Sequence, residues 1–474
     1  MRSPAAHPRH VIADWAAPSQ WRAANNTAEG TASALDLRQG VVAVARWHNW
    51  AGNAESRPTR ILTPRSVDEV VSAVQAAAAR ELPVRMVGAG HSCSPAAVTS
   101  GVMLTSDGMV GVEQVSDTEV RVLPGTTVDQ LCRELDSLGL ALPAVGDIRA
   151  ETVAGAALTA QHGSGRQTPS LTAGIQALEL VLADGDVVTV AAAQDGDLFQ
   201  AAKAGLGGFG VVTSLTLATV PTYLLHARTF PDRFENTVST FDDWDSDHDM
   251  VEFDWYPHTD RTVVRQFDRS AGPVAHVGRS RRWPSGPIRS FATAGGVARL
   301  GRSLPPAVPG LNRLSAAAQP PGDTTDRWWR VLPTAPKVRF VELEYALPRP
   351  MLRPALTMVR RAIEDGPERV TLPVLVRTGP AEDAWLAPAE GRATVYICLR
   401  VFHRSPYQRY FDTAEAVLTE LEARPRLGTA QSLGAERLAS RYPRFADVQR
   451  VRNRVDPDRR FGNDYLARVL GDGA

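Results

Sequence analysis

Two stretches that are poor in side chains constrain this chain most. The first, Gly88-Ala-Gly-His-Ser92, follows the predicted strand 82–87 directly, and the second runs from Thr152 through His162-Gly-Ser-Gly165. Glycine lets a backbone approach a ligand closely, and successive backbone N–H groups can bind a pyrophosphate. Two such loops in one folded unit are suited to holding both ends of a large cofactor.

His91 lies in the middle of the first loop. A single histidine is more often a structural residue satisfied by hydrogen bonds than a functional one. The second glycine-rich loop changes that balance and favours a histidine that reaches the cofactor with one ring nitrogen.

A third glycine motif, Gly205-Leu-Gly-Gly-Phe-Gly210, satisfies G-x-G-x-x-G. A Rossmann fingerprint needs a strand before it and a helix after it, whereas a helical pattern precedes this motif and the apolar strand 211–217 follows. We therefore interpret these glycines as structural. The sequence contains no phosphate-binding P-loop motif, no HExxH and no GxSxG.

The pattern around the loops predicts an α+β fold. Capping boxes at Ser66-Val-Asp-Glu69 and Thr127-Val-Asp-Gln130 begin predicted helices, and Ala183-Asp-Gly-Asp186 between apolar runs predicts a hairpin. We expect an irregular lead-in over residues 1–56 and a mixed α+β unit over 57–222.

Beyond residue 222 the pattern predicts a second α+β domain, 223–434, in which the stretch 282–324, rich in Pro, Gly and Ala, is expected to be a long loop. Residues 435–474 form a C-terminal segment of helix and Arg-rich chain.

Composition excludes several classes of protein. Basic and acidic residues number 52 each, so no net field attracts nucleic acid. Lys203 and Lys337 are the only lysines, which leaves almost no candidate for Schiff-base chemistry. Cys93, Cys132 and Cys398 are an odd number without CxxC spacing, so we expect neither a disulfide framework nor a metal site.

The first ten residues lack the apolar core of a signal peptide, and no run approaches the roughly 18 apolar residues of a membrane helix. We therefore expect a cytoplasmic protein, a monomer or homodimer, with no membrane partner.

Several stretches, taken in order, carry a family resemblance: Trp47-His-Asn-Trp-Ala-Gly52, Gly88-Ala-Gly-His-Ser92, Thr152-Val-Ala-Gly155 with His162-Gly-Ser-Gly165, Glu342-Leu-Glu-Tyr345, Trp385-Leu-Ala-Pro388 and 456–466. Their order and spacing over about residues 45–474 resemble the aldonolactone oxidase and alditol oxidase branch of the vanillyl-alcohol-oxidase (PCMH-type) flavoprotein superfamily. The resemblance implies a two-subdomain FAD-binding domain, 57–222, completed by the C-terminal segment, and a cap domain, 223–434, over the flavin.

The resemblance also implies a covalent bond from the 8α carbon of FAD to His91. It places these positions at the cofactor: Val87, Gly88, Ala89, Gly90, His91, Ser92, Gly125, Gly146, Asp147, Thr152, Val153, Gly155, Gly163, Gly165, Val212 and Asn463.

The chain departs from the family at the substrate. Sugar-oxidising members carry a Glu-x-Arg pair, a histidine on the next strand and a lysine near the flavin. Leu375-Val-Arg377 keeps only the arginine, Cys398 takes the histidine position, and Thr429 takes that of the lysine. Because these polar partners are absent, we expect a substrate with fewer hydroxyl groups on the side that faces Leu375 and Cys398. Simple polyols and 1,4-lactones are expected to be poor substrates.

A serine next to the flavin in the family corresponds here to Asp147. Either Asp147 is the base that takes a substrate proton, with Arg377 beside it, or Asp147 caps a turn and pairs with Arg377 structurally. The sequence leaves both open, and catalytic roles are predicted for Asp147, Arg377, Cys398 and Thr429.

The family implies that the residue before this position controls oxygen access, and Gly146 leaves that path open. We therefore expect an oxidase of a C–OH or C–N bond that reduces O2 to H2O2. The alternative is a flavin-binding protein that has lost catalysis.

Overall fold

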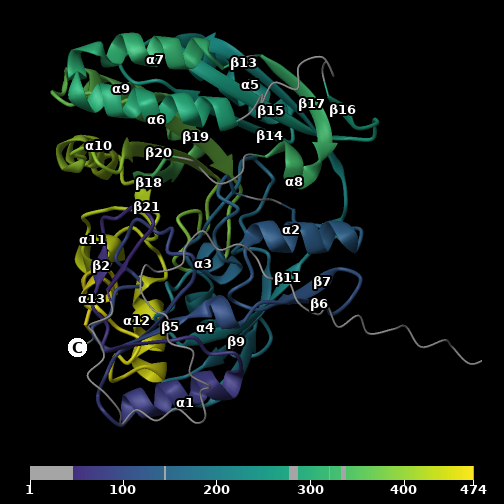
Figure 1. Cartoon of the computed structure of the whole chain (residues 1–474), viewed down its shortest axis with the longest axis vertical. Helices are drawn as coiled ribbons and strands as arrows, with labels where there is room; N and C mark the ends of the chain where they lie inside the picture. Colours follow the sequence, from purple (N-terminus) through teal and green to yellow (C-terminus); the bar gives the residue numbers. More distant parts are fainter. Residues whose placement is uncertain (1–45, 144–145, 277–286, 320, 333–337, 473–474) are drawn as a thin grey trace, which may run out of the picture. The chain divides into compact units, whose positions relative to one another are not determined.

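The computed structural model describes residues 46–143, 146–276, 287–319, 321–332 and 338–472, and it describes no side chains over 287–294. Most of the predicted lead-in, residues 1–45, therefore lies outside the described residues. Within them the fold is α+β, as predicted, and its strands form separate sheets (Figure 1).

The first sheet is small and parallel. It has the order β3-β5-β4, with β3 at Arg60–Leu62, β4 at Val84–Val87 and β5 at Val102–Thr105. Helix α1 (Val67–Ala78) begins after Ser66, whose side chain accepts a hydrogen bond from the Glu69 N–H, and its apolar face packs on this sheet. The predicted helix start is therefore confirmed, and β4 leads directly into the first glycine-rich loop.

The second sheet is antiparallel, with the order β10-β9-β11-β7-β6. Its strands are β6 (Val112–Gln114), β7 (Glu119–Val122), β9 (Ile175–Val181), β10 (Val187–Ala191) and β11 (Val211–Ala218). Strands β9 and β10 form the predicted hairpin.

Three helices accompany this sheet: α2 (Val128–Ser137), α3 (Val153–Leu158) and α4 (Gly196–Lys203). The capping box at Thr127 and Gln130 is present at the start of α2. Helix α4 precedes the motif at 205–210 and β11 follows it, which confirms that the motif lacks a Rossmann context. Two short ladders, β1 (Trp47–His48) with β2 (Glu55–Ser56) and β8 (Leu140–Ala141) with β12 (Val220–Pro221), complete this part.

The third sheet has nine strands in the order β16-β17-β13-β15-β14-β19-β20-β18-β21, and all its pairs are antiparallel. The strands are β13 (Leu224–Arg233), β14 (Met250–Trp255), β15 (Arg261–Ser270), β16 (Ala275–His276), β17 (Gly322–Arg327), β18 (Phe340–Pro348), β19 (Val374–Gly379), β20 (Thr394–Phe402) and β21 (Arg424–Pro425). Helices α5 (Phe234–Asp247), α9 (Leu352–Asp365) and α10 (Gln408–Glu420) lie along it, and a short helix α8 (Trp328–Val331) follows β17 (Figure 1).

The long loop predicted over 282–324 is wrong for the described residues. Helices α6 (Pro287–Ser303) and α7 (Val308–Ala317) occupy most of it, and β17 begins at Gly322. The prolines that read as helix breakers lie in first turns, at the start of the short 3-10 helix 305–307 and of α7, where proline is tolerated because no backbone N–H is needed. Residues 282–286 and 320 lie outside the described residues.

The C-terminal segment forms α11 (Ala435–Ala439), α12 (Phe445–Val455) and α13 (Asp464–Leu470). It lies against the first sheet, because the Val84 N–H donates to the Arg460 carbonyl at 2.7 Å and the Arg460 guanidinium donates to the Leu82 carbonyl at 2.9 Å. Asn463 caps α13 and donates to three carbonyls of the loop after β4, those of Pro95, Ala96 and Val98. The domain limits at 57, 222 and 434 stay predictions.

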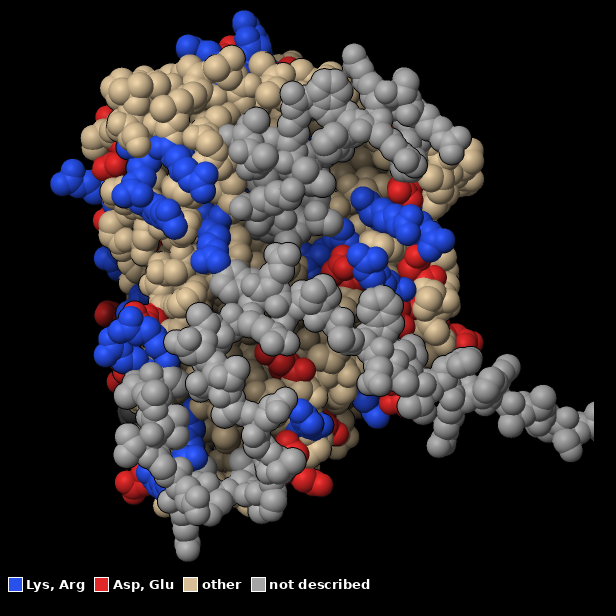
Figure 2. Space-filling model, viewed as in Figure 1, with Lys and Arg blue, Asp and Glu red and all other residues tan. Residues whose placement is uncertain are grey.

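The three cysteines are all free and buried. No helix among the described residues is long and apolar enough to cross a membrane. On the visible face basic and acidic side chains are interspersed, as the equal numbers of the two suggest (Figure 2).

Candidate active site

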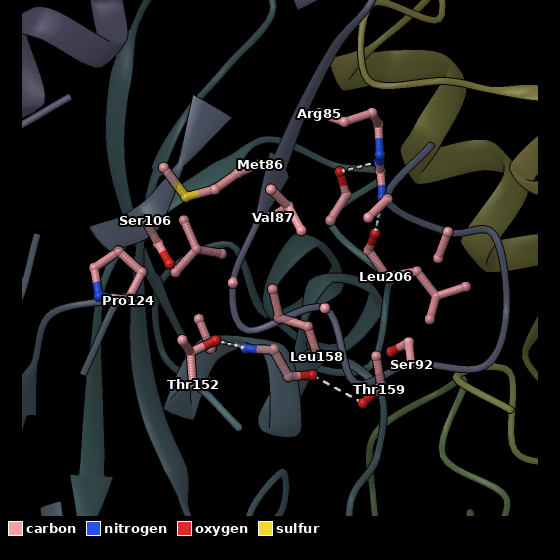
Figure 3. A pocket seen from close by; sticks show the side chains of 18 of the residues that line it. Arg85, Met86, Val87, Ser92, Ser106, Pro124, Thr152, Leu158, Thr159 and Leu206 are labelled. Atoms are coloured by element: carbon pink, nitrogen blue, oxygen red, sulfur yellow. Dashed lines mark hydrogen bonds between the residues drawn. The ribbon is translucent and has the colours of Figure 1, made fainter. Parts of the chain in front are cut away.

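A cavity lies beside the first glycine-rich loop (Figure 3). Strand β4, the loop after it, helix α3, the motif at 205–210 and Phe461 of the C-terminal segment line the cavity. The predicted cofactor residues on its wall are Val87, Gly88, Ala89, Gly90, His91, Ser92, Thr152, Gly155 and Val212. Residues from three separate parts of the chain therefore meet at one cavity.

The other predicted cofactor residues do not line this cavity. Val153 is buried in α3, Gly125 follows the lining residue Pro124, and Asn463 ties α13 to the loop after β4. Gly163 and Gly165 belong to the second loop, where the Gly165 N–H donates to the Thr378 carbonyl of β19 at 3.1 Å.

Close contact between the two loops requires glycine. A Cβ at Gly88 would lie 2.0 Å from Oγ1 of Thr152, the residue whose hydroxyl accepts from the Gly155 N–H at the start of α3. Gly90 has a φ of +68°, which favours glycine, and its carbonyl accepts from the Trp50 N–H at 2.8 Å. The loop therefore presents backbone, and few side chains, to the cavity.

His91 carries a buried polar atom that is not satisfied. Its ring stacks on Trp50 with the centroids 4.9 Å apart, and its Nδ1 has no hydrogen-bond partner among the described residues. Burial, and then the positive charge of Arg339, lowers the pKa of His91 to about 4, so the ring is neutral at physiological pH. The buried hydroxyl of Ser106, also on the cavity wall, is likewise without a partner in the described part of the chain. Such atoms are rare in folded proteins and indicate a bound group.

A buried ion-pair network lies on one face of the nine-stranded sheet, and it reaches the cavity where Arg426 donates to the carbonyl of the lining residue Thr159. We define it by its members, which are Glu252, Asp254, Arg265, Arg377, Arg400, Glu342, Glu344 and Arg426 from the sheet and its edge, with Asp147 and His162 from the loops around α3. Arg265 and Arg377 both donate to Glu252, at 2.6 and 2.9 Å. Arg400 donates to Asp147 at 2.7 Å and to Glu342 at 2.8 Å.

Strand register explains why these side chains meet. Glu342 pairs with Arg400 and Glu344 with Cys398 across β18 and β20, and Cys398 pairs with Leu375 across β20 and β19. Since alternate residues of a strand point to one side, these residues share one sheet face. Arg426 follows β21 and contacts both carboxylates of β18, Glu342 at 2.7 Å and Glu344.

His162 connects the second loop to this face. Its Nε2 lies 2.7 Å from a Glu344 oxygen, its Nδ1 lies 2.9 Å from the Gly163 carbonyl oxygen, and its ring stacks on Tyr396 at a centroid distance of 3.5 Å. Because a carbonyl oxygen only accepts, Nδ1 is the donor in the contact with Gly163. Burial opposes the charge on Glu344, yet Arg426 and His162 hold its pKa well below the usual range.

Asp147 lies where the sequence placed it, beside Arg377, at 3.4 Å. The sequence missed Arg400, which binds the other oxygen of the same carboxylate. Although burial raises the pKa of Asp147, the two guanidinium groups together hold that pKa far below its ordinary value. An anion stabilised in this way accepts a proton poorly, so the geometry favours the structural alternative for Asp147 over the role of base.

Cys398 and Thr429 are both buried at this face. Burial and the neighbouring Glu342 raise the pKa of the Cys398 thiol well above its ordinary value, so the sulfur is uncharged. The Thr429 hydroxyl donates to the Arg426 carbonyl at 2.8 Å and accepts from the Glu344 N–H at 3.2 Å. Thr429 therefore holds the edge of the network, and its catalytic role stays a prediction.

The sheet face that carries Leu375 and Cys398 has more polar groups than these two positions suggest. Leu375 and Cys398 are indeed apolar or neutral, but Glu252, Glu342, Glu344 and Arg400 occupy the same face. Sequence reasoning missed these residues. One signal was present, because the alternating Glu342-Leu-Glu344 places two carboxylates on one side of a strand, which a buried sheet face tolerates only when cations pair with them.

Comparison with known proteins agrees with this geometry. The profile of an FAD-binding domain matches residues 58–191, and that of D-arabinono-1,4-lactone oxidase matches 215–469. L-gulono-1,4-lactone dehydrogenase of Mycobacterium tuberculosis is 34% identical over 433 residues, which cover 90% of this chain and 99% of that protein. Alditol oxidase of a Streptomyces species is 28% identical, with 89% and 98% covered. Cholesterol oxidase of Brevibacterium sterolicum shares the fold, with a TM-score of 0.74 at 16% identity over 90% of this chain and 96% of that one.

The fold, the cavity and these matches define the class of the protein, an FAD-dependent oxidoreductase with a PCMH-type fold. Within that class, the chain belongs to the D-arabinono-1,4-lactone oxidase family. The cavity fits FAD, because it offers two loops of accessible backbone and, on His91 and Ser106, unsatisfied polar atoms.

Proposed function

We propose that this protein oxidises a hydroxyl-bearing carbon of a polyhydroxylated small molecule, of the aldonolactone or alditol class, to a carbonyl, with FAD bonded to His91 and with O2 as the final acceptor. Bound FAD supplies the hydride acceptor. The observation that carries the proposal is the unpartnered Nδ1 of His91, a residue on the wall of the cavity. The ion-pair network borders that cavity, since Arg426 donates to the carbonyl of the lining residue Thr159 at 3.5 Å.

Three features support attachment at His91. The ring is neutral, which leaves a nitrogen lone pair free for bond formation, because burial keeps the pKa of His91 at about 4. Stacking on Trp50 fixes the orientation of the ring. The loop on both sides of His91 consists of small residues, so the cofactor can approach without displacing bulky side chains.

The ion-pair network supports a hydroxylated substrate. A buried hydroxyl without a partner costs about 1–3 kcal/mol, so a molecule with a row of hydroxyl groups needs several donors and acceptors. Asp147, Arg400 and Arg426 retain 18%, 16% and 13% side-chain exposure, and these groups supply both kinds. This replaces the expectation of a less hydroxylated substrate, which depended on Leu375 and Cys398 alone.

Gly146 supports oxygen as the acceptor. It carries no side chain, and it lies directly before Asp147 at the end of the network. The names of the relatives differ on this point, since the mycobacterial protein is called a dehydrogenase and the Streptomyces protein an oxidase. The final electron acceptor of this protein therefore has to be tested separately from its substrate.

An anaerobic titration of the bound flavin tests the proposal. The panel contains L-gulono-1,4-lactone, D-arabinono-1,4-lactone, xylitol, an amino sugar and a simple amine. We expect at least one lactone or the polyol to bleach the flavin absorbance, and the amine to leave it unchanged. Bleaching by the amine alone would contradict the substrate class. A bound flavin that no member of a wide panel reduces would support a flavin-binding protein that has lost catalysis.

A further inference from the structure

We propose that Glu151 is a further catalytic acid–base residue of this protein, a carboxyl between the cofactor cavity and the ion-pair network that takes the proton released by the substrate hydroxyl. Neither the family resemblance nor the predicted site included this residue. The inference rests on the proposed function, because it concerns the proton that the proposed oxidation must remove.

The position of Glu151 differs from that of every carboxylate in the ion-pair network. Its side chain lines the cofactor cavity, one residue before Thr152, the residue that the first glycine-rich loop contacts. Its backbone is anchored, since its carbonyl accepts from the Val128 N–H at 2.9 Å. Within the described part of the chain, no arginine, lysine or histidine forms an ion pair with its carboxyl group, whereas Asp147, Glu252 and Glu342 each bind two arginines.

The charges that face Glu151 come from several elements. Arg426 follows β21, Glu342 and Glu344 project from β18, Asp147 precedes it on its own loop, and the Cys93 thiol lies on the loop after β4. Burial, which Arg426 opposes and the three carboxylates reinforce, raises the pKa of Glu151 to about 8. Glu151 therefore changes protonation near neutral pH, where a proton acceptor is most effective, while Asp147, Glu252 and Glu344 stay ionised.

The proposed step balances. The substrate C–H bond breaks, and its hydrogen would pass with the bonding electron pair, as hydride, to bound FAD. The O–H bond breaks, its proton forms a new O–H bond on a carboxylate oxygen of Glu151, and the electron pair left on the oxygen forms the second bond of the C=O group. The proton then leaves Glu151 for solvent before the next turnover. Asp147 and Glu344 are poor alternatives, because the arginines that bind them lower their pKa values and stabilise their ionised forms.

The experiment compares the holoenzyme with its Glu151→Gln variant over pH 5.5–10. The first readout is the absorbance spectrum of the oxidised flavin, which needs no substrate. In the wild type we expect a spectral transition with an apparent pKa near 8, produced by the charge that appears on Glu151, and in Glu151→Gln we expect none. The second readout is the anaerobic rate of flavin reduction by an accepted lactone or polyol. That rate should rise with pH up to about 8 in the wild type, and in the variant it should be lower by roughly 10²–10⁴-fold and independent of pH.

Two further variants make the test specific. Asp147→Asn removes a negative charge that raises the pKa of Glu151, so the transition should move to lower pH and persist. Glu113→Gln, at an exposed carboxyl that pairs with Arg121 at 3.6 Å, should leave both the transition and the rate unchanged.

Glu151→Gln should fold, because it keeps the shape of the side chain and removes no ion pair. A transition near pH 8 that survives in Glu151→Gln, or a reduction rate within threefold of the wild type, would overturn the assignment of Glu151 and leave the proposed function intact. A bound flavin that no substrate reduces would contradict the proposed function, and the spectral titration would still decide whether Glu151 titrates beside the flavin. A protein that holds no flavin would overturn both.

Discussion

The cofactor cavity and the ion-pair network lie side by side and are built in opposite ways. The cavity wall is mostly backbone, small residues and apolar groups, and it leaves Nδ1 of His91 and the hydroxyl of Ser106 without partners. In the network nearly every charged atom already has a partner within the chain. The difference separates a region completed by a bound group from a region that is organised before anything binds. Substitutions that disrupt one of these regions should therefore leave the properties of the other region measurable.

The largest effect should follow removal of a guanidinium from the network. Arg377→Met leaves Glu252 with one of its two arginines and Asp147 with Arg400 alone. Removing one partner of a buried ion pair typically costs about 3–5 kcal/mol, and we expect that loss in urea unfolding monitored by circular dichroism. Arg361→Met, at an exposed pair with Asp365, should change the unfolding free energy by less than about 1 kcal/mol. Equal effects of the two changes would mean that the network contributes no more than a surface pair.

Glu151→Gln should alter how stability depends on pH. The pKa of Glu151 is about 8 in the folded protein against an ordinary value of 4.5, so the folded state keeps a proton that the unfolded state releases between these pH values. The wild type therefore loses stability relative to Glu151→Gln as pH rises from about 4.5 to about 8. Outside this range the unfolding free energies of the two proteins should change with pH in the same way. We expect a divergence of roughly 1–3 kcal/mol between pH 5 and pH 8 in urea unfolding. A divergence of the opposite sign would show that Glu151 is ionised at neutral pH.

Asp147→Asn should separate the two roles that the sequence left open. If Asp147 mainly holds Arg377 and Arg400, the variant loses about 1–3 kcal/mol of stability and still reduces its flavin with the pH dependence that Glu151 confers. We expect this result. A fall of roughly 10²–10⁴-fold in the reduction rate, with the pH dependence abolished, would instead identify Asp147 as the base. Stopped-flow reduction under anaerobic conditions distinguishes the two.

The smallest effect should come from Gly146→Ala, which tests the reaction with oxygen. We expect reoxidation of the dithionite-reduced flavin to slow by roughly tenfold, with the rate of flavin reduction by substrate unchanged. A Cβ at Gly146 would lie 2.8 Å from Cδ of the buried Gln161, so the methyl group also displaces that side chain. The pair Gly146→Ala with Gln161→Ala relieves the contact. If the double variant recovers the wild-type oxygen rate, packing and not oxygen access explains the slow reaction.

Local sequence signals predicted the helix caps and a hairpin, whereas contacts between residues far apart in the chain could not be predicted. The helix caps at Ser66 and Thr127 and the hairpin at 183–186 depend on neighbouring residues, and the structure has all three. The partners of Asp147 depend on sheet register, since Arg377 and Arg400 lie 230 and 253 residues away in the chain. A single sequence gives no such register. The helices α6 and α7 were missed for another reason, because proline in a first turn looks the same in sequence as proline in a loop.

The central claim is that the cavity is completed by FAD bonded to His91, and peptide mapping after acid precipitation tests it most directly. We predict a yellow precipitate whose flavin absorbance follows one proteolytic peptide, the peptide that contains His91. His91→Ala should give a colourless precipitate and release any bound FAD into the supernatant, because the backbone groups of the loop remain while the neutral ring nitrogen is lost. Free FAD in the supernatant of the wild type, or flavin on a peptide without His91, would contradict the account.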